Sequence, residues 1–310
     1  MFSIVIPVYK NEGNIAPLIE ALSNLNSKFE QGLEVVFVVD GSPDKSYLLL
    51  EESLNNVEFR SQLIAHSRNF GSFAAILTGL NYAKGESFGV MAADLQEPPE
   101  LMIDFQKALD EGHDIAVGTR ETRDDPFMSS IFSNLFWTMY KKFVQPEIPQ
   151  GGVDVFGCSK RVRDQLVSLK ELNTSLVALL YWIGFSRKVV SYVRRKREIG
   201  VSAWTFKRKL KYLMDSVFAF TDLPIRLFYK IGFFSLAVSV VYALIIIISK
   251  TTGMISLPGY SATIVTILFF SALNSIGLAI IGSYTWRAYE NTKGRPVSIV
   301  MNTKVFDAIK

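Results

Sequence analysis

The first 120 residues of this 310-residue chain alternate short apolar runs with segments of helical periodicity. The apolar runs are the expected strands: Phe2–Val8, Leu33–Val39, Gln62–Ala65, Phe88–Ala93 and Asp114–Val117. The expected helices between them are Asn14–Phe29, Ser72–Ala83 and Glu100–Asp110. Strands that alternate with helices of this length form βαβ units with right-handed crossovers. The alternation therefore predicts an α/β domain built on a parallel sheet.

Polar residues follow each expected strand. In open α/β sheets, ligands bind beyond the carboxyl ends of the strands. The segments at those ends are rich in Asp, Glu, Asn, Ser and Arg, and they are Val8–Glu12, Asp40–Asp44, His66–Gly71, Asp94–Glu97 and Gly118–Arg120. The sequence therefore predicts a polar ligand site along this edge of the sheet.

Several familiar site motifs do not occur in the sequence. There is no G-x-G-x-x-G after the first strand and no G-x-x-x-x-G-K-[S/T], so dinucleotide and P-loop sites lack support. The two histidines, His66 and His113, are too few and too far apart for a zinc site and fit structural roles better than catalytic ones. The acids Asp40, Asp44 and Asp94 could bind a nucleotide or hold Mg²⁺ beside its phosphates. Helix caps or turn residues are the alternative for each acid.

Two stretches near the C-terminus, Ile231–Ser249 and Ser261–Trp286, contain no charged residue. Each is long enough to cross a bilayer as a helix. Buried core helices are the alternative, which the four consecutive isoleucines Ile245–Ile248 disfavour. The connection Lys250–Tyr260 carries one charge and both flanks are basic, so the positive-inside rule predicts a hairpin with cytoplasmic flanks.

The region before these stretches is strongly basic. Between Arg187 and Lys230 there are twelve Lys/Arg and three acids. Within it, Lys207–Tyr229 has an apolar face opposite a basic one, which fits a helix in the membrane interface and fits a helix packed on the domain core nearly as well. A basic belt at this position suits anionic headgroups or a phosphorylated lipid. Nucleic acid is not the expected partner, because the basic patch adjoins a membrane segment.

Two further features concern the compartment. The single cysteine, Cys158, excludes an intramolecular disulfide and is compatible with a reducing compartment. Met1–Ile4 lead directly into the first expected strand without a basic region, so no signal peptide is expected.

The strand-end segments form an ordered set of sequence strings. These are I-P-V-Y-K-N-E (6–12), V-V-D-G-S-P-D (38–44), S-R-N-F-G (67–71), A-A-D-L-Q-E-P-P-E (92–100) and V-G-T-R (117–120), followed by P-Q-G-G-V-D-V-F (149–156) and R-x-x-G-x-S (197–202). In this order and spacing the chain resembles family 2 glycosyltransferases. The closest resemblance is to the branch that makes polyprenyl-phosphate sugars, such as dolichyl-phosphate mannose synthases and bacterial undecaprenyl-phosphate glucosyltransferases. It covers nearly the whole chain, including the membrane hairpin.

The resemblance implies a GT-A (Rossmann-like) nucleotide-sugar domain and a set of site residues. Those of the nucleotide pocket would be Pro7, Tyr9, Asn11, Glu12, Ser42 and, near the base, Asp40. Asp94 and Gln96 would lie at the donor diphosphate and at a bound Mg²⁺ or Mn²⁺. Arg120, Arg197 and Ser202 would face phosphates, the last two from a loop that closes over the donor. Asp154 would lie near the reacting sugar, so the expected catalytic residues are Asp94, Asp154 and Arg197.

Three positions depart from the family pattern. The family usually has Asp-Asp-Gly-Ser and Asp-Ala-Asp, and Val39 and Ala92 replace the first acid of each. The Ser-Lys common after R-x-x-G-x is Ser202-Ala203 here. One acid together with the substrate's phosphates can still hold Mg²⁺, so the sequence predicts a working site with weaker metal binding than a two-acid site.

The expected organisation is a cytoplasmic GT-A domain (1–205), a juxtamembrane amphipathic helix (206–230), transmembrane helices (231–249 and 261–286) and a cytoplasmic tail (287–310). The resemblance further implies a multi-pass inner-membrane protein that forms homo-oligomers.

The function expected from the resemblance is inverting transfer of a sugar from a nucleotide-diphosphate sugar to polyprenyl phosphate. UDP-glucose is the preferred donor, with a GDP-sugar possible, and the product would supply cell-envelope glycan or O-antigen modification. The acceptor is already an anion, so no strong general base is needed. One alternative is a catalytically impaired scaffold subunit, suggested by Val39 and Ala92. Another is a processive polysaccharide synthase, which the chain disfavours because it lacks further spans and a Q-x-x-R-W motif.

Overall fold

The computed structural model describes residues 1–121, 138, 140–142, 144–149, 152–169, 171, 174–195, 206–252 and 259–309. The chain divides into two compact units. The sheet unit comprises Met1–Tyr212 and Arg295–Lys310, and the helical unit comprises Leu213–Gly294. In sequence, the helical unit is therefore an insertion between two parts of the sheet unit.

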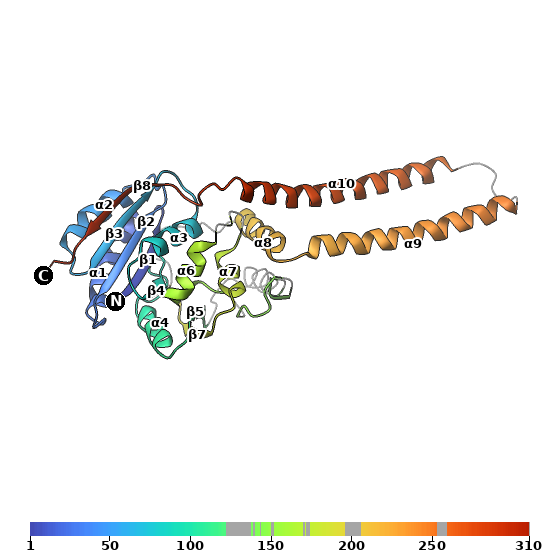
Figure 1. Cartoon of the computed structure of the whole chain (residues 1–310). Coiled ribbons are helices and arrows are strands. Elements are labelled where there is room, and N and C mark those ends of the chain that lie inside the picture. The colour runs from blue at the N-terminus through green and yellow to red at the C-terminus, as the bar shows by residue number, and fades with distance from the viewer. Residues whose placement is uncertain are drawn as a thin grey trace. The chain divides into compact units, whose positions relative to one another are not determined.

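A mixed sheet of eight strands forms the centre of the sheet unit (Figure 1), in the order β7-β5-β6-β4-β1-β2-β3-β8. Its strands are β1 (Phe2–Val8), β2 (Leu33–Val39), β3 (Arg60–His66), β4 (Ser87–Val90), β5 (Ile115–Arg120), β6 (Val155–Ser159), β7 (Arg187–Tyr192) and β8 (Val300–Phe306). The four strands β1–β4 pair in parallel in the order β4-β1-β2-β3, and β5 is parallel to β7. In contrast, β6 and β8 are antiparallel to their neighbours.

Helices pack against this sheet and complete the core. They are α1 (Ile15–Asn26), α2 (Ser46–Ser53), α3 (Ser72–Tyr82), α4 (Leu101–Asp110), α6 (Lys160–Ser168) and α7 (Leu176–Trp182), with short 3₁₀ turns at Glu12–Asn14 and Leu54–Asn56. All seven residues of β2 are buried, as expected for a parallel strand covered on both faces. The buried residues of α1 recur at helical spacing, at Ile15, Leu18, Leu22 and Leu25.

The predicted α/β class is confirmed, and the strand positions differ from prediction mainly at their ends. β4 ends at Val90, before the predicted end at Ala93, although the Met91 N–H still donates to the Val5 carbonyl at 3.1 Å. β5 continues to Arg120 and so carries a predicted site residue at its last position. The C-terminal tail contributes β8, which pairs with β3 and which the sequence pattern does not predict.

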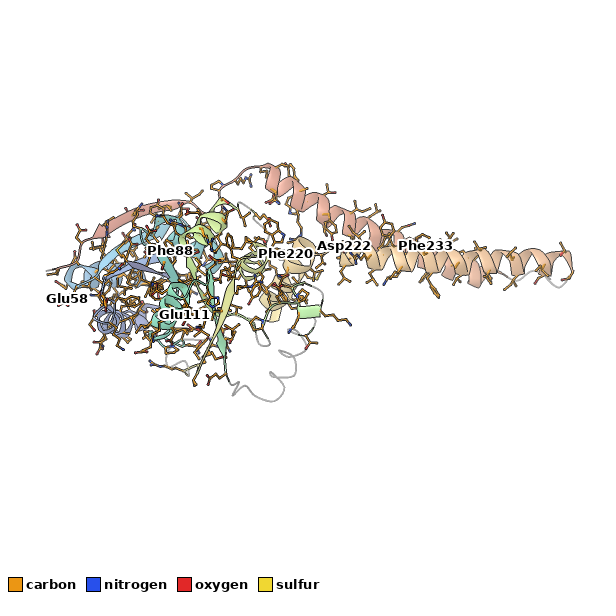
Figure 2. All side chains as sticks on the ribbon, turned by 60° about the horizontal axis from the view of Figure 1, so that its bottom comes forward. Glu58, Phe88, Glu111, Phe220, Asp222 and Phe233 are labelled. Atoms are coloured by element: carbon orange, nitrogen blue, oxygen red, sulfur yellow. The ribbon has the colours of Figure 1, made fainter. Side chains whose placement is uncertain are left out.

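The helical unit contains two long helices, α9 (Leu223–Thr251) and α10 (Tyr260–Thr292), and the end of α8 (Phe206–Phe220). α9 and α10 lie side by side (Figures 1 and 2), and a Cβ added to Gly277 would lie 2.3 Å from the Phe228 ring. Nearer the start of the unit, Arg287 Nη2 donates to Asp215 Oδ1 at 2.7 Å. The close approach of Phe228 to Gly277 thus joins α9 to α10, and the Arg287–Asp215 ion pair joins α10 to α8.

One segment of the described residues is long and apolar enough to cross a membrane, Leu223–Tyr242 of α9. Within it only Ser235 is buried, and all its other residues are exposed or half-buried. Phe233, for example, projects outward from α9 and is 73% exposed (Figure 2). The predicted stretches Ile231–Ser249 and Ser261–Trp286 are both helical, but the transmembrane hairpin that they would form is not confirmed and remains a prediction.

Candidate active site

The exits of β1 and β2 are joined by hydrogen bonds between backbone and side chains. The Lys10 N–H donates to Ser42 Oγ at 2.7 Å, and the Glu12 N–H donates to Asp44 Oδ2 at 3.1 Å. In return, Glu12 Oε2 accepts from the Lys45 N–H at 3.0 Å. The predicted residues Glu12 and Ser42 therefore lie in one hydrogen-bonded edge, and both use their side chains to hold it together.

The other predicted pocket residues of the first loop occupy the same edge. Pro7 is paired with Val38 at the end of β1, and the Asn11 N–H donates to Ser46 Oγ at 3.2 Å. Tyr9 is 37% exposed. An exposed aromatic ring beside a polar edge can stack on a nucleobase, because every base has a π-face.

Asp40 is buried, and both of its carboxylate oxygens are engaged within the protein. Oδ1 accepts from the Phe70 N–H at 2.8 Å and lies 2.9 Å from His66 Nδ1, and Oδ2 accepts from the Gly71 N–H at 2.7 Å. Burial by itself would raise the pKa of Asp40, but these hydrogen bonds outweigh it and lower the pKa below its ordinary value. Asp40 therefore fixes the loop after β3, and its predicted place near a base remains a prediction.

The Asp40–His66 pair extends toward the C-terminal segment. His66 Nε2 lies 3.0 Å from Thr78 Oγ1, and that hydroxyl lies 2.7 Å from Ser298 Oγ. The Ile299 carbonyl accepts from the Ser67 N–H at 3.0 Å. The segment that leads into β8 is thus hydrogen-bonded both to α3, through Thr78, and to the loop after β3, through Ser67.

The segment after β4 forms a second polar corner. Leu95 has a positive φ of 52°, which is uncommon for a residue with a side chain and marks a locally strained turn. The Gln96 N–H donates to Asp94 Oδ1 at 3.3 Å, and the Gln96 carbonyl accepts from the Arg195 N–H at 2.9 Å. The Arg194 guanidinium donates to the side-chain oxygen of Gln96. The residues after β7 therefore close over the predicted metal corner.

Arg120, the last residue of β5, and Asp154, directly before β6, form a two-bond ion pair. Arg120 Nε donates to Asp154 Oδ2 at 2.5 Å and Nη2 donates to Oδ1 at 2.7 Å. Tyr192, which is paired with Arg120 in the sheet, donates its hydroxyl to Asp154 Oδ2 at 2.9 Å. Burial would lower the pKa of Arg120, but the bonds and charge of Asp154 raise it. Two predicted residues are thus brought together, with Tyr192 as a third member.

Glu97 is a buried acid of the segment after β4, and its pKa responds to the charges of both Asp94 and Asp154. It is 3% exposed, and its Oε2 has no hydrogen-bond partner among the described residues. Burial, followed by the charges of Asp94 and Asp154, raises the pKa of Glu97 to about 7. Glu97, Tyr192 and Arg194 are not among the predicted site residues. The only signal for Glu97 is an acid two residues before the second proline of D-L-Q-E-P-P-E.

Two predicted residues, Arg197 and Ser202, lie outside the described residues. The helix-cap alternative for Asp94 is wrong, because α4 begins seven residues later and its N-cap is Glu100. For Asp44 a turn role is confirmed, since Oδ1 accepts from the Ser46 N–H at 3.2 Å at the start of α2.

The described residues contain no cluster of three or more His, Cys, Asp or Glu side chains that could hold a metal ion. The oxygen donors in the corner nevertheless suit Mg²⁺ or Mn²⁺, because hard divalent cations prefer carboxylate oxygens and substrate phosphates. Asp94 and the unpartnered oxygen of Glu97 fit such an ion, whereas the side-chain oxygen of Gln96 is already bound to Arg194.

Comparison with known proteins identifies relatives that align with nearly the whole chain, and they are glycosyltransferases. The Glycosyl transferase family 2 pattern matches residues 3–167. A putative glycosyltransferase, CsbB, of Bacillus subtilis (strain 168) is 33% identical over 305 residues, covering 98% of this chain and 92% of the relative. A bactoprenol glucosyl transferase of Shigella phage SfV is 28% identical over 306 residues, covering 97% of this chain and 98% of the relative.

Solved structures with a similar fold are more distant. Glucosyl-3-phosphoglycerate synthase from Mycobacterium tuberculosis, solved with Mn²⁺, uridine diphosphate and phosphoglyceric acid, aligns with a TM-score of 0.48 and 16% identity. The alignment covers 64% of this chain and 72% of that protein.

Proposed function

The chain belongs to glycosyl transferase family 2, and from this membership we propose that it transfers a sugar, by preference glucose, from a nucleoside-diphosphate sugar to a polyprenyl phosphate. The protein is a glycosyltransferase with an α/β sheet domain of GT-A type. The polyprenyl acceptor is supported by a relative named bactoprenol glucosyl transferase, to which this chain aligns almost end to end. The product would be a lipid-linked sugar for glycans of the cell envelope.

The observation that carries the proposal is the Arg120–Asp154–Tyr192 group, with Arg120 and Tyr192 at the last positions of β5 and β7 and Asp154 directly before β6. A bidentate arginine pair holds a carboxylate in a fixed plane, which suits a group that must orient a sugar hydroxyl or an acceptor. Asp154 accepts hydrogen bonds from three donors, so we assign it an orienting role and not that of a general base. This agrees with an acceptor phosphate that is already an anion.

The donor would bind along the edge formed by the exits of β1, β2 and β4. Tyr9 offers a stacking surface to the base, and the segment containing Asn11, Glu12 and Ser42 is held rigid for the ribose. Negative charge then develops on the departing diphosphate, where Asp94 would hold Mg²⁺ or Mn²⁺ and Arg197 would donate hydrogen bonds. When bound, the metal would supply positive charge that stabilises this leaving group. Ser202 would contact a phosphate. Asp40 would hold the loop after β3 in position beside the nucleotide, through its hydrogen bonds from the Phe70 and Gly71 N–H groups.

Chain connectivity supports a membrane hairpin. The sheet unit contains the chain both before and after the helical unit, since β8 pairs with β3. An inserted segment that leaves one side of a membrane and returns to it must cross an even number of times. With Leu223–Tyr242 as one crossing, the long helix α10 would be the second. The basic flanks would put the sheet unit and both ends on the cytoplasmic side, with α8 at the interface and lipid phosphate near its basic residues. Homo-oligomers remain a prediction.

The proposal can be tested with the purified full-length chain in nanodiscs. The reaction would contain undecaprenyl phosphate, Mn²⁺ or Mg²⁺, and one of a panel of UDP- and GDP-sugars, and the lipid product would be identified by mass spectrometry. We expect a glycolipid with UDP-glucose and none with the Asp154→Asn variant. If nucleotide sugars bind but no donor yields glycolipid, the scaffold alternative replaces this proposal.

A further inference from the structure

Glu97 is the least satisfied acid in the described part of the site. Its side chain is almost wholly removed from water, yet Oε2 has no hydrogen-bond partner among the described residues. Buried carboxylates in proteins are normally paired, hydrogen-bonded or bound to a metal, because isolated burial of the charge is unfavourable. An unpartnered oxygen at this depth indicates that something absent from the protein alone completes the site.

The neighbours of Glu97 identify the kind of partner that is needed. The carboxylates of Asp94 and Asp154 both act on Glu97 as like charges. Arg194 is the cation whose charge lowers the pKa of Glu97. Its Nη2, however, donates to Gln96, and no ion pair joins Arg194 to Glu97 among the described residues. A buried acid among like charges is neutralised either by a proton, which the raised pKa of Glu97 allows, or by a bound cation.

The usual ligands of a two-acid corner are not available here. Ala92 has a methyl group where a carboxylate would complete the pair with Asp94. The side-chain oxygen of Gln96 is occupied by Arg194. Glu97 lies three residues after Asp94 in the same segment, and the strained turn at Leu95 separates them.

We propose that Glu97 supplies the second carboxylate for the divalent cation, together with Asp94, and so compensates for Ala92. The inference rests on the proposed function only in assuming that a metal–nucleotide complex binds at this corner. Gln96 then acts as a positioning residue that holds Arg194, and not as a metal ligand.

The test is Mn²⁺ binding to the full-length chain in detergent, measured by electron paramagnetic resonance of free Mn²⁺, with and without saturating UDP. Glu97→Gln removes the charge with little change in shape. We expect it to weaken Mn²⁺ binding in the presence of UDP at least tenfold. Glu100→Gln is the matched control, because Glu100 is an exposed acid of the same segment that pairs with Lys28, and its change should be less than twofold.

A rescue variant separates a ligand from a structural residue. Ala92→Asp combined with Glu97→Gln places one carboxylate back beside Asp94 and should restore Mn²⁺ binding to within about threefold of the wild type. Without metal, Glu97→Gln should unfold at the same temperature as the wild type or higher, because it removes a buried acid with an unpartnered oxygen and like-charged neighbours. A lower unfolding temperature, or Mn²⁺ binding equal to the wild type, would overturn the proposal, and so would failure of Ala92→Asp to rescue.

The readout is independent of glycolipid synthesis. Tight, Glu97-dependent Mn²⁺ binding without any product would sustain this inference and reject the proposed function. Glycolipid formation together with Mn²⁺ binding that is unchanged in Glu97→Gln would sustain the proposed function and reject this inference. Should Glu97→Gln not fold, Glu97→Asp keeps the charge and is expected to retain binding within about threefold, whereas a loss comparable to that of Asp94→Ala would refute the assignment.

Discussion

Arg120 donates two hydrogen bonds to the carboxylate of Asp154, from Nε at 2.5 Å and from Nη2 at 2.7 Å. Arg120 is the last residue of β5, and Asp154 directly precedes β6, which is antiparallel to β5. Strand pairing therefore fixes both backbones before the side chains meet. The orientation of Asp154 is built into the sheet and does not depend on a ligand.

Replacing Arg120 with lysine should lower kcat by about ten- to a hundredfold and leave KM for the donor nearly unchanged. Lysine keeps the charge but cannot make two parallel bonds, and a charge-assisted hydrogen bond contributes about 1.5–3 kcal/mol. Steady-state kinetics of glycolipid formation would measure the change. Arg161→Lys is the control, because Arg161 makes a similar pair with Asp114 just before the start of β5, and its kcat should stay within about twofold.

Tyr192→Phe removes the third donor to Asp154. We expect kcat to fall by about three- to tenfold and the free energy of unfolding to fall by about 1 kcal/mol, the typical contribution of one buried hydrogen bond. Burial, and then the charge of Asp154, raise the pKa of Tyr192. The hydroxyl should therefore remain a donor across the working range, and a wild-type activity profile with a break near pH 8 assigned to this residue would contradict its role.

Asp40→Asn should make the protein less stable at neutral pH and less sensitive to acid. The pKa of Asp40 is lowered in the folded protein, so its stabilisation is present above the ordinary value of 3.8 and is lost as pH falls through the folded pKa. His66 is the titratable group that faces it, and the other donors are backbone N–H groups. Urea unfolding in detergent between pH 3 and 7 would measure this.

In those experiments Asp40→Asn should lower the free energy of unfolding at pH 7 by about 1–3 kcal/mol, because two backbone donors lose charged acceptors. Its loss of stability below pH 4 should be shallower than that of the wild type. Asp104→Asn, at an exposed carboxylate of α4, should match the wild type at both ends of the range. Parallel curves for Asp40→Asn and wild type would show that Asp40 does not carry the acid sensitivity.

Gly41→Ala should be strongly destabilising. Gly41 has a φ of 57°, and a Cβ there would lie 2.3 Å from the Arg68 backbone carbon. Left-handed backbone costs an alanine about 1–2 kcal/mol, and the clash adds to this. Gly112→Ala isolates the first effect, because Gly112 also has a positive φ, of 93°, but open space around it. Thermal unfolding should rank Gly41→Ala well below Gly112→Ala; equal losses would mean that the β3 loop simply moves away.

Local sequence pattern predicts the first five strands and the polar residues after them, since each depends on hydrophobicity within a few residues. It also predicts Arg120 and Asp154 as site residues, but only through the family resemblance. Their pairing depends on β5–β6 register across a long intervening segment, which periodicity does not encode.

Other features depend on contacts between distant parts of the chain. Glu97 is buried near Arg194, about 100 residues later, so its environment is invisible in D-L-Q-E-P-P-E itself. Likewise β8 has mostly exposed residues and a weak apolar pattern. It is a strand because its backbone pairs with the free edge of β3.

The position of β8 has a consequence for biosynthesis. During translation the edge of β3 has no partner until Val300–Phe306 have emerged, which is after both long helices have been made. Until then this edge of the sheet is open and able to pair with other chains, while α9 and α10 are being synthesised. A version of the sheet unit that simply stops before α8 therefore lacks its last strand. A complete sheet unit requires a splice that connects residues near 212 directly to residues near 295, so that the final strand is still supplied.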